Sequence, residues 1–246
     1  YNLVGIILGS EGTLAVITRI ILKLIPAPRY SLDLLVPFDS LDDAINAVFS
    51  IIERRIVPAA LEFMEEDAIK LVAGFLKSDM PFPLAGAHLM IQIDGNSEEQ
   101  LDDDLEKITE VIGVEQEKII VAASDIHRQR LWKARRSIRE AIKAESPVFL
   151  AEDCVVPRAN IPVFLIELKK YLSSMGLNSV MFGHAGDGNV HIDILKGAMD
   201  YQHWLDIVPV LKKEIYSRAL KLGGTITGEH GIGFIRKNYL GLALSE

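Results

Sequence analysis

Apolar residues either alternate with polar ones or follow one another in short runs along the chain. Such runs predict β-strands, because β-branched and aromatic residues favour the extended backbone. We expect strands at Leu32–Pro37, Ala59–Met64, His88–Asp94, Lys118–Ala122, Val148–Val156, Ser179–Phe182 and Asn189–Leu195. Between the strands, apolar residues recur at the spacing of one helical face. We expect helices over residues 41–52, 66–76, 98–112, 124–143, 161–175 and 201–222.

The order of these elements indicates the fold class. Two β-α-β units occupy the first half, and Ser97 and either Asp39 or Ser40 are placed to cap their helices. Two such units are typical of a ferredoxin-like sheet. We therefore predict an α+β fold with a ferredoxin-like antiparallel sheet that carries its helices on one face.

The first residues form a unit of their own. Val4–Leu24 is predicted to form a strand, a turn at Gly9-Ser10-Glu11-Gly12 and a second strand. Pro26 and Pro28 end this unit and mark the best domain boundary in the chain. The sequence begins at Tyr1 and enters the apolar unit at once, so we interpret it as a fragment or a processed product.

Composition and charge narrow the possible partners. The chain has 246 residues, of which 49% are hydrophobic, and its formal net charge is −8. This acidic balance argues against nucleic acid, although the Arg128–Arg139 stretch is basic. A single cysteine, Cys154, excludes an intrachain disulfide and fits a reducing compartment. No apolar run reaches the roughly 18 residues that a membrane span needs, so we expect no transmembrane segment.

Two glycine-rich segments carry the candidate chemistry. The first runs from Gly183 to His191 and the second from Gly223 to Gly233. His184 and His191 stand on either side of a tight turn, and imidazole is a common ligand of Zn, Mn or Fe. Glu229 can add a carboxylate, which gives two histidines and one carboxylate with open positions. His230 is then placed to act as a general base.

Other interpretations of these segments stay open. A glycine-rich turn with two histidines also occurs as a solvated loop that binds nothing. A phosphate-binding loop is a further alternative, but neither segment has the Gly-Lys-Ser/Thr ending or the spacing of a dinucleotide fingerprint. Nucleic-acid binding through the basic stretch is disfavoured by the net charge.

Together the two segments resemble the signature of the C-terminal (cap) domain of FAD-linked oxidases in the vanillyl-alcohol-oxidase superfamily, of the glycolate oxidase and D-lactate dehydrogenase type. The stretch Leu8–Thr18 resembles the last strands of that family's FAD domain, and Pro58–Met64 resembles another family segment. The resemblance covers nearly the whole chain. It implies a flavin-dependent enzyme that converts a small D-2-hydroxy acid to the 2-keto acid.

The resemblance also implies residue roles. His184, His191 and Glu229 match divalent metal ligands, and His230 matches the catalytic base. Two more residues match substrate contacts: Asn189, and Arg135, whose planar guanidinium suits a carboxylate. Contacts with FAD are implied for Gly9, Ser10, Gly12 and Ile17.

The implied domains are a C-terminal remnant of the FAD-binding domain at residues 1–29 and a substrate- and metal-binding domain at residues 30–246, without its C-terminal tail. We expect such a fragment to lose FAD and to be inactive by itself. The implied partners are a 2-hydroxy acid and an electron acceptor or partner subunits. The implied location is cytoplasmic, with peripheral membrane association through partner subunits.

One position departs from the pattern of hydroxyglutarate-type members. They carry a lysine two residues before the Asp that matches Asp153, and this chain has Ala151 there, followed by Glu152. This difference favours a small monocarboxylate such as glycolate or D-lactate. The alternative from another class of function is a non-catalytic subunit-interface or regulatory module derived from the same family.

Overall fold

A computed structural model describes residues 1–77, 83–122 and 124–244 of the chain. Within them, seven strands form one sheet in the order β4-β1-β3-β2-β6-β7-β5, and every pair of neighbours is antiparallel. The strands are β1 (Tyr30–Phe38), β2 (Ala60–Glu65), β3 (Ala87–Gly95), β4 (Ile120–Ala122), β5 (Phe149–Val155), β6 (Asn178–His184) and β7 (Asn189–Leu195).

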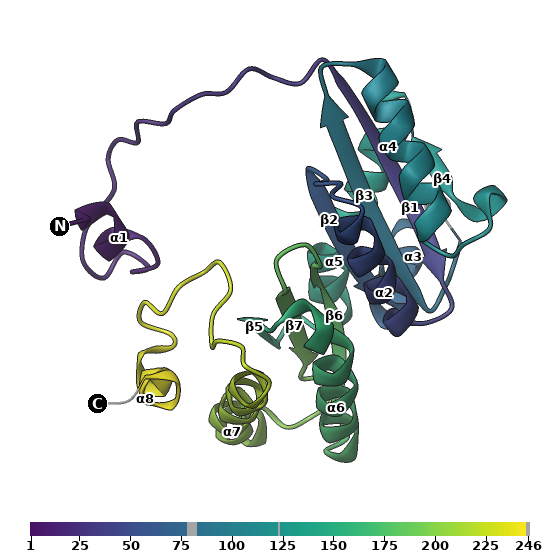
Figure 1. Cartoon of the computed structure of the whole chain (residues 1–246). Coiled ribbons are helices and arrows are strands. Elements are labelled where there is room, and N and C mark those ends of the chain that lie inside the picture. The colour runs from purple at the N-terminus through teal and green to yellow at the C-terminus, as the bar shows by residue number, and fades with distance from the viewer. Residues whose placement is uncertain (78–82, 123, 245–246) are drawn as a thin grey trace.

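Helices connect and cover the strands (Figure 1). They are α1 (Leu3–Ile7), α2 (Leu41–Glu53), α3 (Glu66–Leu76), α4 (Glu98–Val111), α5 (Asp125–Glu145), α6 (Ile161–Ser174), α7 (Tyr201–Lys221) and α8 (Leu240–Ala243). None of the helices in the described ranges has both the length and the apolar character that crossing a membrane requires.

Local capping fixes where several helices begin. The hydroxyls of Ser40, Ser97 and Ser124 each accept a hydrogen bond from a backbone N–H three residues later, at the starts of α2, α4 and α5. A capping oxygen satisfies one of the four N–H groups that a helix start leaves unpaired. Of the two predicted caps for α2, Ser40 is therefore the one used.

The first half of the sheet has the ferredoxin-like order β4-β1-β3-β2, with α2 and α4 as its crossover helices. The second half adds β6, β7 and β5 beyond β2 and thereby makes one continuous sheet. The predicted α+β class with a ferredoxin-like antiparallel sheet is confirmed.

The prediction that the helices lie on one face of the sheet is wrong, because helices cover both faces. Side chains of α2, α4, α6 and α7 pack against alternate strand residues such as Leu34 and Phe63, while α3 and α5 pack against the opposite set, such as Leu35 and Met64. The physical reason is visible in β1, where Leu34, Leu35 and Val36 are all fully buried. A strand that is apolar on both sides needs a layer on each side.

The predicted strands of the N-terminal unit are wrong for this chain. Residues 3–7 form the short helix α1, and residues 15–28 have no regular secondary structure. Apolar side chains in the second stretch, including Val16 and Ile21, are exposed. A strand needs a neighbouring strand for its backbone hydrogen bonds, and none is paired with this stretch within the described residues. Figure 1 shows α1 apart from the sheet and near the C-terminal segment.

A buried histidine in β3 makes stability depend on pH. His88 is fully buried, and burial lowers its pKa from 6.5 to about 4. As the pH falls below the pKa of the unfolded chain, only the unfolded state takes up this proton, so the stability contribution of neutral His88 is lost between about pH 6.5 and 4. We predict that this histidine contributes roughly 3 kcal/mol to that loss.

Urea unfolding of the wild type and of His88→Leu at pH 7 and at pH 4.5 measures the effect. The variant should lose less unfolding free energy than the wild type over this interval, whatever its stability at pH 7. Equal losses in the two proteins would contradict the assignment.

Candidate metal and proton-transfer site

The hairpin between β6 and β7 brings two histidines together. His184 ends β6, and His191 lies in β7 opposite Phe182, so both imidazoles are on the face of the sheet that α5 covers. Their Nε2 atoms are 3.3 Å apart. The turn requires Gly188, which has φ of 84° and whose Cβ would lie 2.2 Å from the carbonyl oxygen of Val156.

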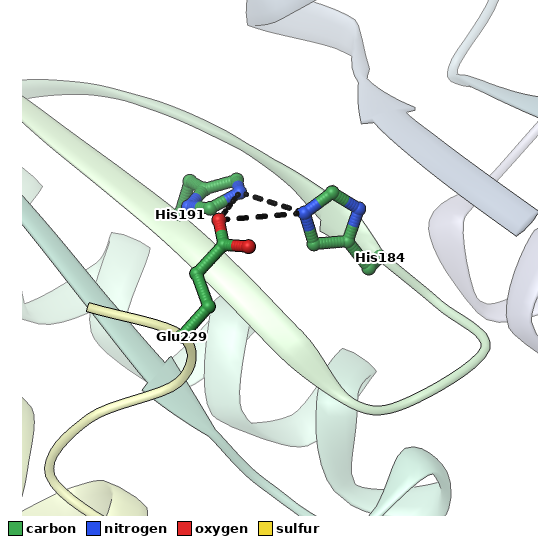
Figure 2. Close-up of side chains that lie close together, drawn as sticks. All are labelled: His184, His191 and Glu229. Atoms are coloured by element: carbon green, nitrogen blue, oxygen red, sulfur yellow. Dashed lines mark hydrogen bonds and ion pairs between the residues drawn. The ribbon is translucent and has the colours of Figure 1, made fainter. Parts of the chain in front are cut away.

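Glu229 joins the two histidines from a loop that follows α7. Its Oε1 atom lies 3.7 Å from Nε2 of His184 and 3.7 Å from Nε2 of His191. Figure 2 shows the three side chains pointing toward one another. The segments that the sequence analysis combined are therefore adjacent in space, and the three ligand atoms lie within 4.8 Å of one another.

The donor set fits a divalent metal ion. Two nitrogens bound to one ion at about 2.0–2.1 Å are separated by roughly 3.0–3.4 Å, and the two Nε2 atoms of the histidines meet this condition. Burial, followed by the charge of Arg135, lowers the pKa of His191 to about 3, which keeps this imidazole neutral. Neutral imidazole is the form that binds metals. Two histidines and a carboxylate suit Zn, Mn or Fe.

Glu62 in β2 orients His184. Its Oε1 lies 2.5 Å from Nδ1 of His184, which directs Nε2 toward the cluster. This hydrogen bond raises the pKa of His184, against the opposing effect of burial. A carboxylate that accepts the second ring N–H is the usual support of a metal-bound histidine. Glu62 was not among the residues predicted from the sequence, although a carboxylate within the apolar strand Ala60–Glu65 was a usable signal.

Arg135 of α5 lies on the other side of Glu62. Its Nη2 is 2.7 Å from Oε2 of Glu62, and its guanidinium lies 4.6 Å from the centre of the Phe182 ring. The side chains of Arg135 and Glu62 are 11% and 10% exposed. Arg135 is thus next to the candidate site, and one edge of its guanidinium is already bound. Its predicted grip on a substrate carboxylate stays a prediction.

One turn later, α5 presents a second arginine to the same face. Arg139 pairs with the fully buried Asp193 of β7 at 2.6 Å and lies 5.7 Å from the centre of the Phe182 ring. Burial raises the pKa of Asp193 to about 7, although Arg139 opposes the shift. Two arginines therefore lie over one aromatic ring, and each is paired with a buried carboxylate.

Asp153 of β5 holds the loop that carries Glu229. Its Oδ2 accepts hydrogen bonds from the backbone N–H groups of Gly228 and Glu229, at 2.8 Å and 2.9 Å. Its Oδ1 pairs with Nη2 of Arg236 at 2.6 Å. Asp153 lies opposite His191 in the β5–β7 register. This pair of strands therefore positions the candidate ligand His191 directly and the candidate ligand Glu229 through Asp153.

Arg236 connects this loop to Glu152, the residue next to Asp153 in β5. Its side chain is buried, its Nη2 is 3.0 Å from Oε2 of Glu152, and its Nη1 donates to the carbonyl oxygen of Gly231. Glu152 also accepts the hydroxyl hydrogen of Tyr216 at 2.6 Å and pairs with Lys212 at 2.7 Å. Asp153 and Arg236 were not predicted to support the site, because neither stands at a ligand spacing along the chain.

The two remaining predicted residues take different positions. The side chain of Asn189 is buried under Gly228, since a Cβ on that glycine would lie 2.2 Å from Oδ1 of Asn189. His230 is exposed beside the cluster, with its Nε2 3.7 Å from Oε1 of Glu229. His230 is therefore solvent-exposed, whereas the side chain of Asn189 is buried against Gly228. Their predicted roles in substrate binding and proton transfer stay predictions.

The predicted flavin-contacting residues lie on the N-terminal unit. Gly9, Ser10 and Gly12 belong to a turn that contacts the loop after Glu229, and Ile17 lies in the exposed apolar stretch. Their contact with FAD stays a prediction.

The fold and the cluster define an α+β domain with a candidate metal centre on one face of its sheet. The family model for FAD linked oxidases, C-terminal domain, matches residues 27–246. The chain belongs to this family of FAD-linked oxidases.

Several relatives support the assignment. The chain is 37% identical to a D-lactate dehydrogenase of Anaerostipes hadrus over 99% of its own length and 53% of that protein. It is 34% identical to the glycolate oxidase subunit GlcD of Bacillus subtilis over 100% of its length and 52% of that protein. The chain therefore spans about half the length of these curated relatives.

Solved structures share the fold at low sequence identity. Alkyldihydroxyacetonephosphate synthase matches with a TM-score of 0.61 at 18% identity, over 92% of this chain and 46% of that one. p-Cresol methylhydroxylase with substrate bound matches with a TM-score of 0.61 at 12% identity, over 85% of this chain and 47% of that one. These likenesses show the fold alone.

We predict that Glu62→Gln weakens Zn²⁺ binding about 10- to 100-fold, because the amide holds His184 less firmly and no longer pairs with Arg135. Glu65→Gln is the matched control. Glu65 is also a buried carboxylate of β2, with a cationic partner in Lys169, but its neighbours are on the opposite face of the sheet.

Competition with a chromophoric chelator measures the two affinities. A loss of affinity in Glu65→Gln equal to that in Glu62→Gln would show that the effect is general destabilisation. An unchanged affinity in Glu62→Gln would remove Glu62 from the site.

Proposed function

We propose that this chain is the substrate- and metal-binding half of a flavin-dependent dehydrogenase that oxidises a small D-2-hydroxy acid to the 2-keto acid. The observation that carries the proposal is the convergence of His184, His191 and Glu229 on one point, with His230 exposed beside it. Relatives named D-lactate dehydrogenase and glycolate oxidase subunit GlcD support this choice of substrate class.

His184, His191 and Glu229 would hold the metal ion. A bound divalent ion supplies Lewis acidity, which lowers the pKa of a hydroxyl that binds it. The protein's own contribution is to keep the ligands in place: Glu62 orients His184, and Asp153 holds the backbone of Glu229. Zn, Mn and Fe all suit this donor set.

His230 would take the hydroxyl proton of the substrate on its Nε2. The His230 side chain is exposed, and its Nε2 lies 3.7 Å from the carboxylate oxygen of Glu229, so a hydroxyl near the cluster is within reach of the imidazole. Imidazole is the side chain most often used for such a transfer near neutral pH. Arg135 and Arg139 lie on the same face, each paired with a carboxylate, and the remaining N–H groups of their guanidinium groups would suit an anionic substrate.

FAD, when bound by the whole protein, supplies the acceptor for the hydride that leaves C2 of the substrate. We propose that residues 1–29 belong to the FAD-binding domain and residues 30–246 to the substrate domain. The exposed apolar side chains of Val16 and Ile21 support this division, because they form a surface suited to packing against further protein.

The small side chain of Ala151 supports a monocarboxylate substrate. Ala151 is exposed and lies opposite Asp193 in the β5–β7 register, on the same face as Asp153 and His191. It adds no positive charge that could bind a second carboxylate. We therefore propose glycolate or D-lactate rather than a dicarboxylate.

The non-catalytic module remains the alternative, and partner subunits are compatible with either function. In a non-catalytic module, nothing would require the candidate metal ligands to stay close together. The short distances among His184, His191 and Glu229 therefore favour the enzyme.

We predict about one divalent ion per chain in the wild type after loading with Zn²⁺ and dialysis, and close to none in the double variant His184→Ala, His191→Ala. Elemental analysis gives both values. His203→Ala, which removes an exposed histidine of α7, should retain the ion. Absence of the ion from the wild type would contradict the metal site.

We predict that His230→Ala in the complete flavoprotein lowers kcat for the 2-hydroxy acid by at least about 100-fold, because the transfer of the hydroxyl proton loses its acceptor. Turnover is followed by flavin reduction, and the metal content is measured in the same preparation. Near-normal turnover with the metal in place would rule out the role of His230 as the base.

A further inference from the structure

The turn near the N-terminus contacts the loop that carries Glu229 and His230. The carbonyl oxygen of Gly9 accepts the backbone N–H of Gly233 at 3.0 Å. One carboxylate oxygen of Glu11 accepts the N–H groups of Phe234 and Ile235, at 2.9 Å and 3.2 Å. Residues more than 200 positions apart in the sequence are thus joined by three hydrogen bonds, two of which are charge-assisted.

Two glycines make room for this contact. A Cβ on Gly231 would lie 2.3 Å from Cα of Gly9, and a Cβ on Gly233 would lie 2.2 Å from Cγ of Glu11. Both distances are far below van der Waals contact. The two loops therefore fit together only because the second loop lacks side chains at these positions.

Glu11 has a backbone conformation that is unfavourable for its residue type. Its φ is +52°, between Gly9 and Gly12, which both have φ of +75°. A non-glycine residue in this region costs free energy, and such strain is retained where the surrounding structure over-determines it. Here the conformation places the carboxylate of Glu11 on the two N–H groups of the second loop.

We infer that Glu11 is a positioning residue: its hydrogen bonds to Phe234 and Ile235 hold the loop of Glu229 and His230 in place. We call this contact the latch. Asp153 holds the backbone of Gly228 and of the proposed ligand Glu229, and Glu11 holds that of Phe234 and Ile235. The proposed base His230 lies between these two carboxylate anchors. The inference rests on the proposed function for the metal. Since binding couplings are reciprocal, a metal ion on Glu229 also tightens the latch.

Hydrogen exchange tests the latch without any metal. In Glu11→Gln the amides of Phe234 and Ile235 should exchange at least about fivefold faster than in the wild type, because a neutral amide accepts these hydrogen bonds more weakly. Glu110→Gln, an exposed carboxylate of α4, should leave both rates unchanged. Equal rates in Glu11→Gln and the wild type would overturn the latch.

Zn²⁺ affinity tests the link to the metal site. Glu11→Gln should bind Zn²⁺ about fivefold to tenfold more weakly than the wild type. In a Glu229→Gln background the same substitution should change the affinity by less than twofold, because the residue that it positions is gone. A loss of the same size in both backgrounds would show general destabilisation and overturn the positioning role.

A second variant disturbs the same contact from the loop that carries Glu229, because a Cβ on Gly231 would clash with Gly9. Gly231→Ala should reproduce the faster exchange and the weaker binding while both carboxylates remain. Gly113→Ala is its control, since Gly113 also has a positive φ, of +69°, but a Cβ there meets nothing within 4 Å. Equal effects of the two glycine substitutions would overturn the inference.

The failures of the two proposals can be told apart. If the wild type binds no Zn²⁺, the proposed metal function fails, and the exchange of Phe234 and Ile235 still decides whether the latch exists. If the wild type binds Zn²⁺ and Glu11→Gln binds it equally well, the metal site stands and the positioning role of Glu11 fails.

Discussion

The candidate site depends on the register of β7 between β5 and β6. His191 must lie opposite Phe182 on one side and Asp153 on the other for the ligand, the aromatic ring under the arginines and the loop anchor to share a face. Because side chains alternate along a strand, a slip of one residue would turn His191 into the core and Ile192 out of it. The apolar residues of β7 that face α6 and α7 therefore position the candidate ligand His191 as well as the packing of the core.

Buried carboxylates connect the sheet to the site. Glu62 is shared between His184 and Arg135, and Asp153 is shared between a backbone turn and Arg236. Each carboxylate is desolvated at a cost that its hydrogen bonds must offset. The charge pairs thereby hold the candidate ligands in this arrangement, so the geometry of the candidate centre is set by groups outside the proposed ligand set.

The sequence predicted what depends on local pattern. The helix that Ser97 caps and the α+β class follow from spacing and capping. The residue types of the two glycine-rich segments combined His184 and Glu229 before their distance was known, and the resemblance to a known family matched the same residues. The strands of residues 4–24 and the helix layer on the second face depended on long-range pairing that no local pattern reports. Glu62 and Arg236 went unnoticed for the same reason. The partners of Glu62 lie 73 and 122 positions away, and the carboxylate partners of Arg236 lie 83 and 84 positions away.

The loop after α7 also protects an edge of the sheet. β5 is the last strand in the order, and Val155 and Thr225 exchange backbone hydrogen bonds across its outer side. Arg236 reaches both Glu152 and Asp153, which project to opposite faces, because it lies along this edge. An uncovered strand edge is a template for pairing with other chains. Loosening the loop therefore disturbs more than the candidate metal centre: it uncovers a surface through which copies of the protein can join and aggregate.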